Sequence, residues 1–151
     1  MAEINGRIPT ELAAGRKPMF DSQARSFTAV AEMPLVHAGA AIADTIGLGL
    51  ILKKGDRLLC PVTLSNGAGT ASSTLAIGLR DPVTKVAIDA TAILAATSVA
   101  AAGTAQANTG TKLTAGQRYV LPQDCEVYGT VAGAAVPANQ AIRVEIPYIP
   151  A

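Results

Sequence analysis

The residue types that carry out catalysis are sparse in this chain of 151 residues. His37 is the single histidine and lies in the segment PLVHAGA, so a histidine-based triad would have to be built around this one side chain. No G-x-S-x-G, H-E-x-x-H or P-loop motif is present, and the short GLG and GAG sequences lack the rest of a dinucleotide fingerprint. We therefore predict a structural or surface role for His37 and expect that the chain is not an enzyme.

The aspartates show no spacing that suggests acid-base catalysis or calcium binding. Most of them stand where an expected strand begins or ends, which is typical of turn and cap residues. The D-x-D-x-D pattern of calcium loops is missing. We expect neither a metal nor a cofactor. The aspartates concerned are Asp44, Asp56, Asp81, Asp89 and Asp124.

The two cysteines, Cys60 and Cys125, belong to no C-x-x-C or zinc pattern. Each lies among alternating apolar residues, where a buried free thiol is a common structural residue. The sequence therefore favours reduced thiols in the core over a disulfide.

The composition indicates a surface that is largely covered by protein. Charged residues make up 15% of the chain, below the roughly 25% of an average globular protein, and the mean hydropathy is +0.35. Depletion of charge is a property of interfaces, so we expect contacts with other subunits. A net charge of +1 provides no electrostatic footprint for nucleic acid or an anionic membrane. An aromatic content of 3% provides no stacking platform for single-stranded nucleic acid.

From Phe27 onward, short apolar runs alternate with turn residues, which is typical of a β protein. We expect seven or eight short strands and no long helix. Because crossover helices are missing, a parallel α/β fold is disfavoured, and the prediction is an all-β antiparallel sandwich or jelly-roll-like barrel. The clearest expected strands are IGLGLIL (46–52), RLLCPVTLS (57–65), TLAIGLR (74–80), DCEVYGTV (124–131) and AIRVEIPYI (141–149).

Turn residues suggest how some of these strands connect. The segment KKGD at 53–56 predicts a hairpin, and DPVT at 81–84 predicts a second turn after which KVAID returns as a partner strand. Pro61 cannot donate a hydrogen bond to a sheet, so its strand is expected to lie at an edge or to be bulged there.

The uncharged stretch from Ala90 to Thr111 is long enough to cross a bilayer. It contains several threonines, an asparagine and two glycines, and the segment 58–79 is equally free of charge although it reads as strand, loop and strand. We therefore predict no membrane span. Alanine favours helix, so residues 91–101 are expected to form a short helix or an irregular strand, followed by a loop of small residues to about 111.

The first 25 residues differ from the rest, with scattered charges and no strand alternation or helical stripe. They also lack the apolar region of a secretory signal, which predicts that the chain is made and kept in a cytoplasm. We expect an extended N-terminal arm at 1–25 and a single β domain at 26–151. The arm residues expected to contact a partner are Ile4, Arg7, Ile8, Leu12, Arg16, Lys17 and Phe20.

The order of motifs resembles a known family. In residues 43–149 an A-D-x-I segment precedes an apolar strand, a G-D turn, a strand ending in Ser, a T-L-x-I-G strand with a D-P turn, and an Ala/Thr-rich stretch. This order resembles the small β-rich virion proteins of tailed bacteriophages, in particular capsid decoration (cement) proteins. The closing VYGTVAGAAVPANQAIRVEIPYI is similar to the end of the same pattern.

The resemblance implies a structural protein on the outside of a phage head, assembled in the host cytoplasm. It would bind the major capsid protein, form a homo-oligomer, for which we expect a trimer, and stabilise the shell by bridging its subunits. A tail or fibre-base component is the first alternative. A carbohydrate-binding or adhesin module is the second, although the shortage of aromatic residues argues against it.

Overall fold

The computed structural model describes residues 25–114 and 119–151, and this part of the chain is built of strands without helices. The predicted all-β class is confirmed. The ten strands are β1 (Phe27–Glu32), β2 (Thr45–Leu52), β3 (Arg57–Leu58), β4 (Val62–Asn66), β5 (Thr74–Arg80), β6 (Ala87–Ser98), β7 (Gly103–Ala107), β8 (Tyr119–Val120), β9 (Cys125–Ala132) and β10 (Ile142–Ile149).

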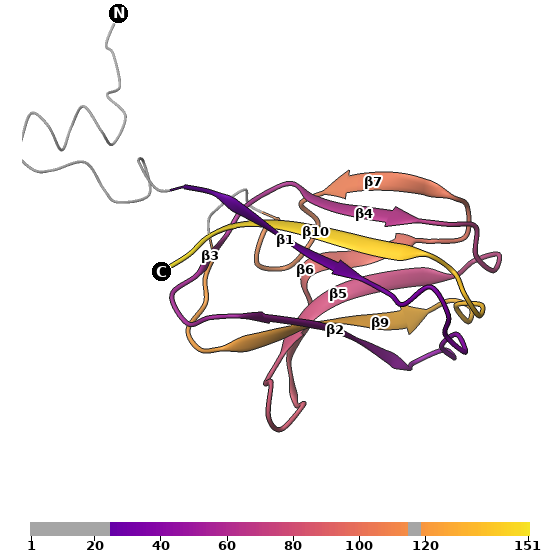
Figure 1. Cartoon of the computed structure of the whole chain (residues 1–151), viewed down its shortest axis with the longest axis horizontal. Coiled ribbons are helices and arrows are strands. Elements are labelled where there is room, and N and C mark those ends of the chain that lie inside the picture. The colour runs from indigo at the N-terminus through magenta and orange to yellow at the C-terminus, as the bar shows by residue number, and fades with distance from the viewer. Residues whose placement is uncertain (1–24, 115–118) are drawn as a thin grey trace, which may run out of the picture.

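The strands of this part of the chain form two antiparallel sheets that face each other (Figure 1). The sheet with β10 at its centre, called here the β10 sheet, contains β1, β3, β4, β7 and β8; the β9 sheet contains β2, β9, β5 and β6. Pairing is nested, because β1 pairs with β10, β2 with β9, β4 with β7 and β5 with β6. In a jelly roll, the first strand pairs with the last, the second strand pairs with the next to last, and so on.

The strand expected at 57–65 is interrupted. Its halves β3 and β4 pair with successive parts of β10, and Cys60 and Pro61 lie in the gap, joined by a cis peptide bond. The irregularity predicted at Pro61 is therefore present. The edge position is wrong, because β4 lies between β10 and β7.

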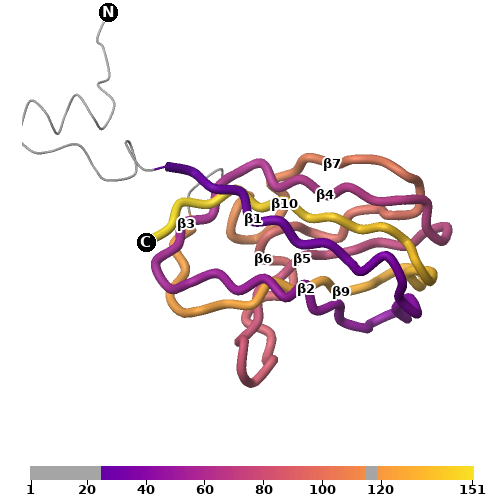
Figure 2. The backbone as a smooth tube through the Cα atoms, in the orientation of Figure 1, coloured from indigo at the N-terminus to yellow at the C-terminus, as the bar shows by residue number. Residues whose placement is uncertain are grey.

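The KKGD segment is not a hairpin. The strand before it, β2, pairs with β9, and the strand after it, β3, pairs with β10, so the turn carries the chain from one sheet to the other. The tube in Figure 2 shows this crossing at the end of the sandwich where β1 begins. The turn predicted at DPVT does join paired strands, since β5 pairs with β6.

The core lies between the sheets and is lined by the alternating residues of the expected strands. On β10, Ile142, Val144 and Ile146 are buried, whereas Arg143 is exposed. Period-two alternation places these apolar side chains on one face, and burying each contributes about 1.5–3 kcal/mol. Leu64 on β4, Leu75, Ile77 and Leu79 on β5, and Val127 and Val131 on β9 are buried too, and on β5 and β9 several residues between them are also buried.

The uncharged stretch 90–111 contains most of β6 and all of β7, which belong to different sheets. The irregular strand expected near 91–101 is confirmed for β6, whose register against β5 shifts between the pairs Ile77–Leu94 and Leu79–Asp89. The helical alternative is wrong, and so is the continuous loop to 111, because Gly103–Ala107 pairs with β4. Tertiary pairing and burial of Ile93 override the helix propensity of alanine here.

Small residues in this region permit close backbone contact. A Cβ atom on Gly110 would lie 2.2 Å from the carbonyl carbon of Ile93, so the loop after β7 packs directly on β6. The amide of Thr111 donates to the carbonyl of Thr91 at 2.9 Å, and the side chain of Leu113 is fully buried. This loop therefore contacts the protein's own sandwich.

Two further findings concern predictions from composition. Within residues 25–114 and 119–151, no helix is long and apolar enough to cross a membrane. Both cysteines are free; the core position predicted for them holds for Cys125, which is buried, whereas Cys60 is half-buried.

Candidate interaction surface

The seven arm residues expected to contact a partner lie outside the residues that the structure describes. They are Ile4, Arg7, Ile8, Leu12, Arg16, Lys17 and Phe20. Their role as contacts stays a prediction.

His37 joins two loops. Its Nδ1 accepts a hydrogen bond from the Gly39 amide at 3.0 Å, so the proton of the neutral ring is on Nε2, which lies 3.0 Å from the Gln140 carbonyl oxygen and donates to it. The His37 amide donates to the side chain of Asn139 at 3.0 Å. The imidazole is occupied by bonds that fix loop geometry, which agrees with the structural role expected for it.

Most of the aspartates lie in turns or loops, as predicted, whereas Asp89 lies within β6. Asp81 accepts hydrogen bonds from the Thr84 and Val83 amides at 2.7 and 2.8 Å, and these bonds lower its pKa. Asp124 accepts from the Lys54 amide at 2.9 Å, which lowers its pKa in the same way. In the described ranges, no group of three or more histidine, cysteine, aspartate or glutamate side chains is placed to hold a metal ion.

The β5–β6 hairpin projects from the body of the sandwich (Figures 1 and 2). Its tip carries exposed apolar side chains: Val83 is 86% exposed and Val86 is 65% exposed, and Ile88 follows on β6. The Asp81 carboxylate accepts the two hydrogen bonds described above, and the Asp81 backbone amide donates another to the Val86 carbonyl oxygen at 2.9 Å. We call Val83, Val86 and Ile88 the tip patch. It is an apolar surface on a turn that is already ordered.

The base of the hairpin is fixed by a charged cluster around Glu126 on β9. Arg80 donates to both carboxylate oxygens of Glu126 at 2.9 and 3.0 Å, and Lys85 Nζ lies 2.6 Å from Oε2. The Arg80 and Glu126 side chains are only 12% and 7% exposed. The Arg80 hydrogen bond, reinforced by Lys85, lowers the pKa of Glu126 to about 2. A bidentate pair of this kind sets both distance and orientation.

The surroundings of Arg80 explain why this cluster is buried. Its guanidinium carbon lies 5.1 Å from the ring centre of Tyr128, and a Cβ on Gly47 would lie 3.1 Å from Nη2. Strand β2 bulges between Gly47 and Leu50, where Gly49 has a φ of +67°, a conformation that glycine adopts without strain. The edge strand and the aromatic ring thereby enclose the ion pair.

A groove with a volume of about 520 Å³ opens at the end of the β10 sheet where β1 and β4 finish and β7 and β10 begin. The segment after β1 and the start of β10 supply its apolar lining: Met33, Pro34, Leu35, Ala141 and Ile142. Leu35 is 89% exposed, so it forms an apolar rim and not part of the core. The volume is in the range of about 300–1,000 Å³ that is typical of ligand sites.

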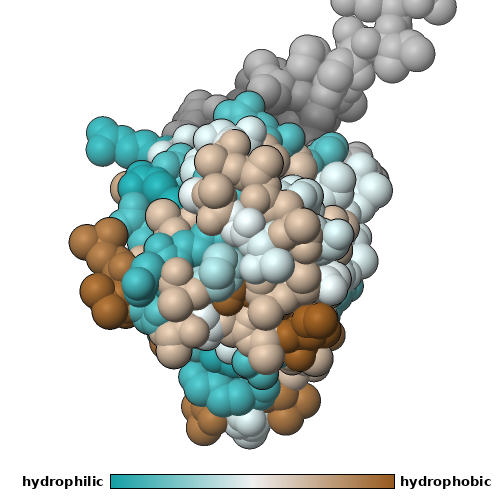
Figure 3. All heavy atoms as spheres, turned by 90° about the vertical axis from the view of Figure 1, so that its right-hand side faces the viewer, coloured by the Kyte–Doolittle hydropathy of each residue, from teal (hydrophilic) through white to brown (hydrophobic). Residues whose placement is uncertain are grey.

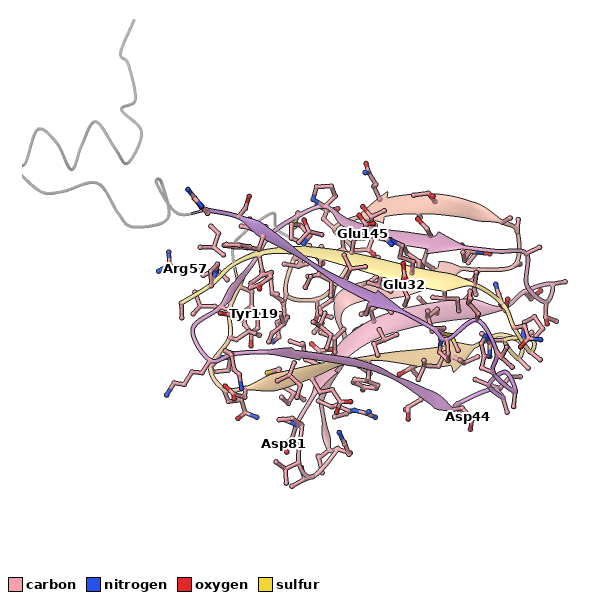
Figure 4. All side chains as sticks on the ribbon, in the orientation of Figure 1. Glu32, Asp44, Arg57, Asp81, Tyr119 and Glu145 are labelled. Carbon is pink, nitrogen blue, oxygen red and sulfur yellow. The ribbon has the colours of Figure 1, made fainter. Side chains whose placement is uncertain are left out.

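The remaining lining of the groove is polar and ordered. Arg143 forms ion pairs with Glu32 and, at 2.7 Å, with Glu145. The hydroxyls of Ser65 and Thr104, on paired strands β4 and β7, are hydrogen bonded at 3.0 Å. Figure 4 shows Glu32 and Glu145 on the β10 sheet and Asp81 on the projecting hairpin.

The loops beneath the groove are held by two amide side chains. Gln140 Nε2 donates to the carbonyls of Gly67 and Val99 at 2.8 and 2.7 Å, and Asn66 Nδ2 donates to those of Val99 and Ala101 at 3.1 and 2.8 Å. The groove is therefore a preformed feature of the fold.

A third apolar region surrounds the end of the sandwich where β1 begins. The rings of Phe27 and Tyr148 lie 6.2 Å apart, and Phe27 is about half exposed. Ile51 at the end of β2 and Val120 on β8 are also about half exposed. Exposed apolar side chains therefore occur at separate corners of the molecule. A view toward the opposite end likewise shows hydrophobic areas set apart by polar surface (Figure 3).

Sequence reasoning missed most of this surface. The DPVT motif indicated a turn, and the valines beside it were the available signal for an exposed apolar tip. Arg80 and Glu126 are 46 residues apart, so their pairing follows only from the β5–β9 register. The groove combines segments from four strands and has no local sequence signal.

No family model matches the sequence, and no curated protein matches it either.

Solved structures with a similar fold do exist. A chain of the structure described as "Capsid of Ralstonia phage GP4" superposes with a TM-score of 0.64 at 22% identity, covering 89% of this chain and 90% of that one. A chain of "Cyanophage Pam1 capsid asymmetric unit" gives a TM-score of 0.59 at 20% identity, covering 89% and 91%. Over nearly its whole length, this protein shares its fold with chains found in the capsids of these two phages.

Proposed function

We propose that this protein is a structural component of a phage virion that decorates the outside of the head and stabilises the shell. The observation that carries the proposal is the likeness of nearly the whole chain to chains in two phage capsid structures. Because a fold hosts many functions, the properties of the surface must support the role independently.

The surface of the described residues fits a part that binds several neighbours. Apolar side chains are exposed at the tip patch, at the groove rim and at the end where β1 begins. Exposed apolar patches on a folded domain mark interaction sites, and separate corners suit separate partners. Most polar groups with functional potential, such as His37 and Glu126, are engaged in bonds that hold the fold. This division favours a structural role over a catalytic one.

The partner in this proposal is the major capsid protein, and the mechanism is bridging. The arm at 1–25 and the apolar corners of the domain at 26–151 would cross joints between capsid subunits, with the protein arranged as a trimer on the virion surface. Each contact is modest, but many copies on one lattice raise the total resistance to separation.

The test compares phage heads that contain this protein with heads that lack it. Both are heated or treated with a chelator, and release of DNA is measured with a dye that cannot enter intact heads. We expect heads without the protein to release DNA at lower temperature, and addition of purified protein to restore the difference. Equal release from both kinds of head would contradict the stabilising role. Co-purification of the protein with isolated tails instead of heads would favour a tail component.

A further inference from the structure

We propose that the hairpin tip of one copy docks into the groove of a second copy, so that the protein assembles head to tail. The contact joins the tip patch, Val83, Val86 and Ile88, to the groove lined by Met33, Pro34 and Leu35. This extends the oligomer in the proposed function to specific surfaces, and its test needs no phage shells.

The tip is a projection and the groove is a hollow, and both carry apolar side chains. The tip is a projecting turn with apolar side chains, and the groove of about 520 Å³ is open and apolar on one side. The polar lining includes Ser65 and Thr104, whose hydroxyls suit the Thr84 hydroxyl of the turn. Burial of Val83 and Leu35 in one contact would remove the two most exposed of the large apolar side chains at these sites from water.

Both partners are ordered before they meet. The tip is held by Asp81 and the Glu126 cluster, and the groove is supported by Gln140 and Asn66. Association is weakened by the entropy lost when loops become ordered on binding. Here that loss is small, because the hydrogen bonds that order both loops are already present within one chain.

The contact must be between copies. The tip extends from the β9 sheet, whereas the groove belongs to the β10 sheet, and Figure 4 places Asp81 and Glu32 at separate parts of the molecule. A projection and a hollow at different places on one chain give a heterologous interface, in which each copy uses its tip on one neighbour and its groove on the other. Such an interface forms a ring when the rotation between neighbouring copies brings the last copy back to the first. A ring of three copies is the trimer of the proposed function.

The first experiment measures the mass of the full-length protein in solution by light scattering over a concentration series. We expect wild type to form an oligomer and Val83→Glu to be monomeric. The matched control is Val30→Glu, which places the same charge on an exposed valine of β1 outside the tip patch, the groove and the third apolar region, and should leave the mass unchanged. The melting curve of each variant verifies folding. A monomeric wild type, or an oligomer that survives Val83→Glu, overturns the inference.

The second experiment tests the pairing directly with cysteines placed at Thr84 on the tip and Thr104 in the groove, both exposed. A mixture of Thr84→Cys and Thr104→Cys proteins should form a disulfide-linked dimer under mild oxidation, whereas neither variant alone should. Thr28→Cys, an exposed threonine on β1, replaces Thr104→Cys as the control and should give no dimer with Thr84→Cys. Equal cross-linking to positions 28 and 104 would overturn the docking site.

The outcomes separate this inference from the proposed function. If Val83→Glu stays oligomeric but wild type binds shells, the docking site is wrong and the decoration role stands. If wild type forms the predicted tip-to-groove oligomer but does not bind shells, the docking site stands and the decoration role fails.

Discussion

Two arginine–glutamate clusters, one on each sheet, contain the same kinds of residues in different surroundings. On the β9 sheet, Arg80 and Glu126 are 12% and 7% exposed and are enclosed by the β2 bulge and Tyr128. On the β10 sheet, Arg143, Glu32 and Glu145 are 46%, 55% and 35% exposed. The buried cluster fixes the base of a projecting hairpin, and the exposed one lines an open groove. The comparison indicates that burial of the side chains, and not their residue types, decides whether such a cluster stabilises the fold.

The largest effect should come from Glu126→Gln. The substitution leaves the enclosed Arg80 guanidinium without its carboxylate, which we expect to lower the free energy of unfolding by about 2–4 kcal/mol. Chemical denaturation measures the change. A loss no larger than that of the matched Glu145→Gln variant on the other sheet would remove the distinction between the clusters.

Acid should weaken the buried cluster in a defined range of pH. The folded protein holds the pKa of Glu126 at about 2, below its ordinary value of 4.5, so this group contributes stability above pH 4.5 that is lost as the pH falls toward 2. Urea titrations across this range should show a steeper loss for wild type than for Glu126→Gln. Parallel curves would show that Glu126 is not the group responsible.

A side chain that crowds Arg80 should lower the stability of the fold less than Glu126→Gln does. A valine at Gly47 would press on the Arg80 guanidinium, whereas a valine at Gly103, in the groove, meets no atom within 4 Å of its Cβ. We expect Gly47→Val to be less stable than Gly103→Val by about 1 kcal/mol, because only the first disturbs a charged hydrogen bond. Thermal unfolding of the two proteins provides the comparison. Equal melting temperatures would mean that Arg80 moves aside without loss.

The smallest effect is expected from Glu32→Gln on the exposed cluster. Arg143 keeps Glu145 as a partner, and solvent screens exposed ion pairs, so the free energy of unfolding should change much less than in Glu126→Gln. Denaturation in low and high salt tests this. A loss comparable to that of Glu126→Gln would show that the groove lining is part of the structural framework.

The sequence predicted the class of fold because period-two alternation is local. Leu75, Ile77 and Leu79 on β5 are buried as their spacing indicated. It predicted the pairing of β5 with β6 across the DPVT turn but not the other pairings, because a short turn such as KKGD reads the same whether it joins neighbours in one sheet or crosses between two. Jelly-roll pairing joins strands far apart in the chain, and no local signal specifies it.

The surface was harder to predict for the same reason. Gly110 looked like part of a loop of small residues, but its function is to let that loop touch the backbone of Ile93. The Arg80–Glu126 pair and the groove exist only once strands from distant parts of the sequence are adjacent. The proposed contacts of the arm, such as Ile8 and Phe20, lie outside the described residues and remain predictions.

The most direct test of the proposed function is electron cryo-microscopy of virions purified from a phage whose genome is shown to carry this sequence. We predict density that fits the ten-stranded sandwich of the described residues at many equivalent positions on the outer surface of the head, in contact with the major capsid protein. Density for this protein confined to the tail, or its absence from the particle, would contradict the account.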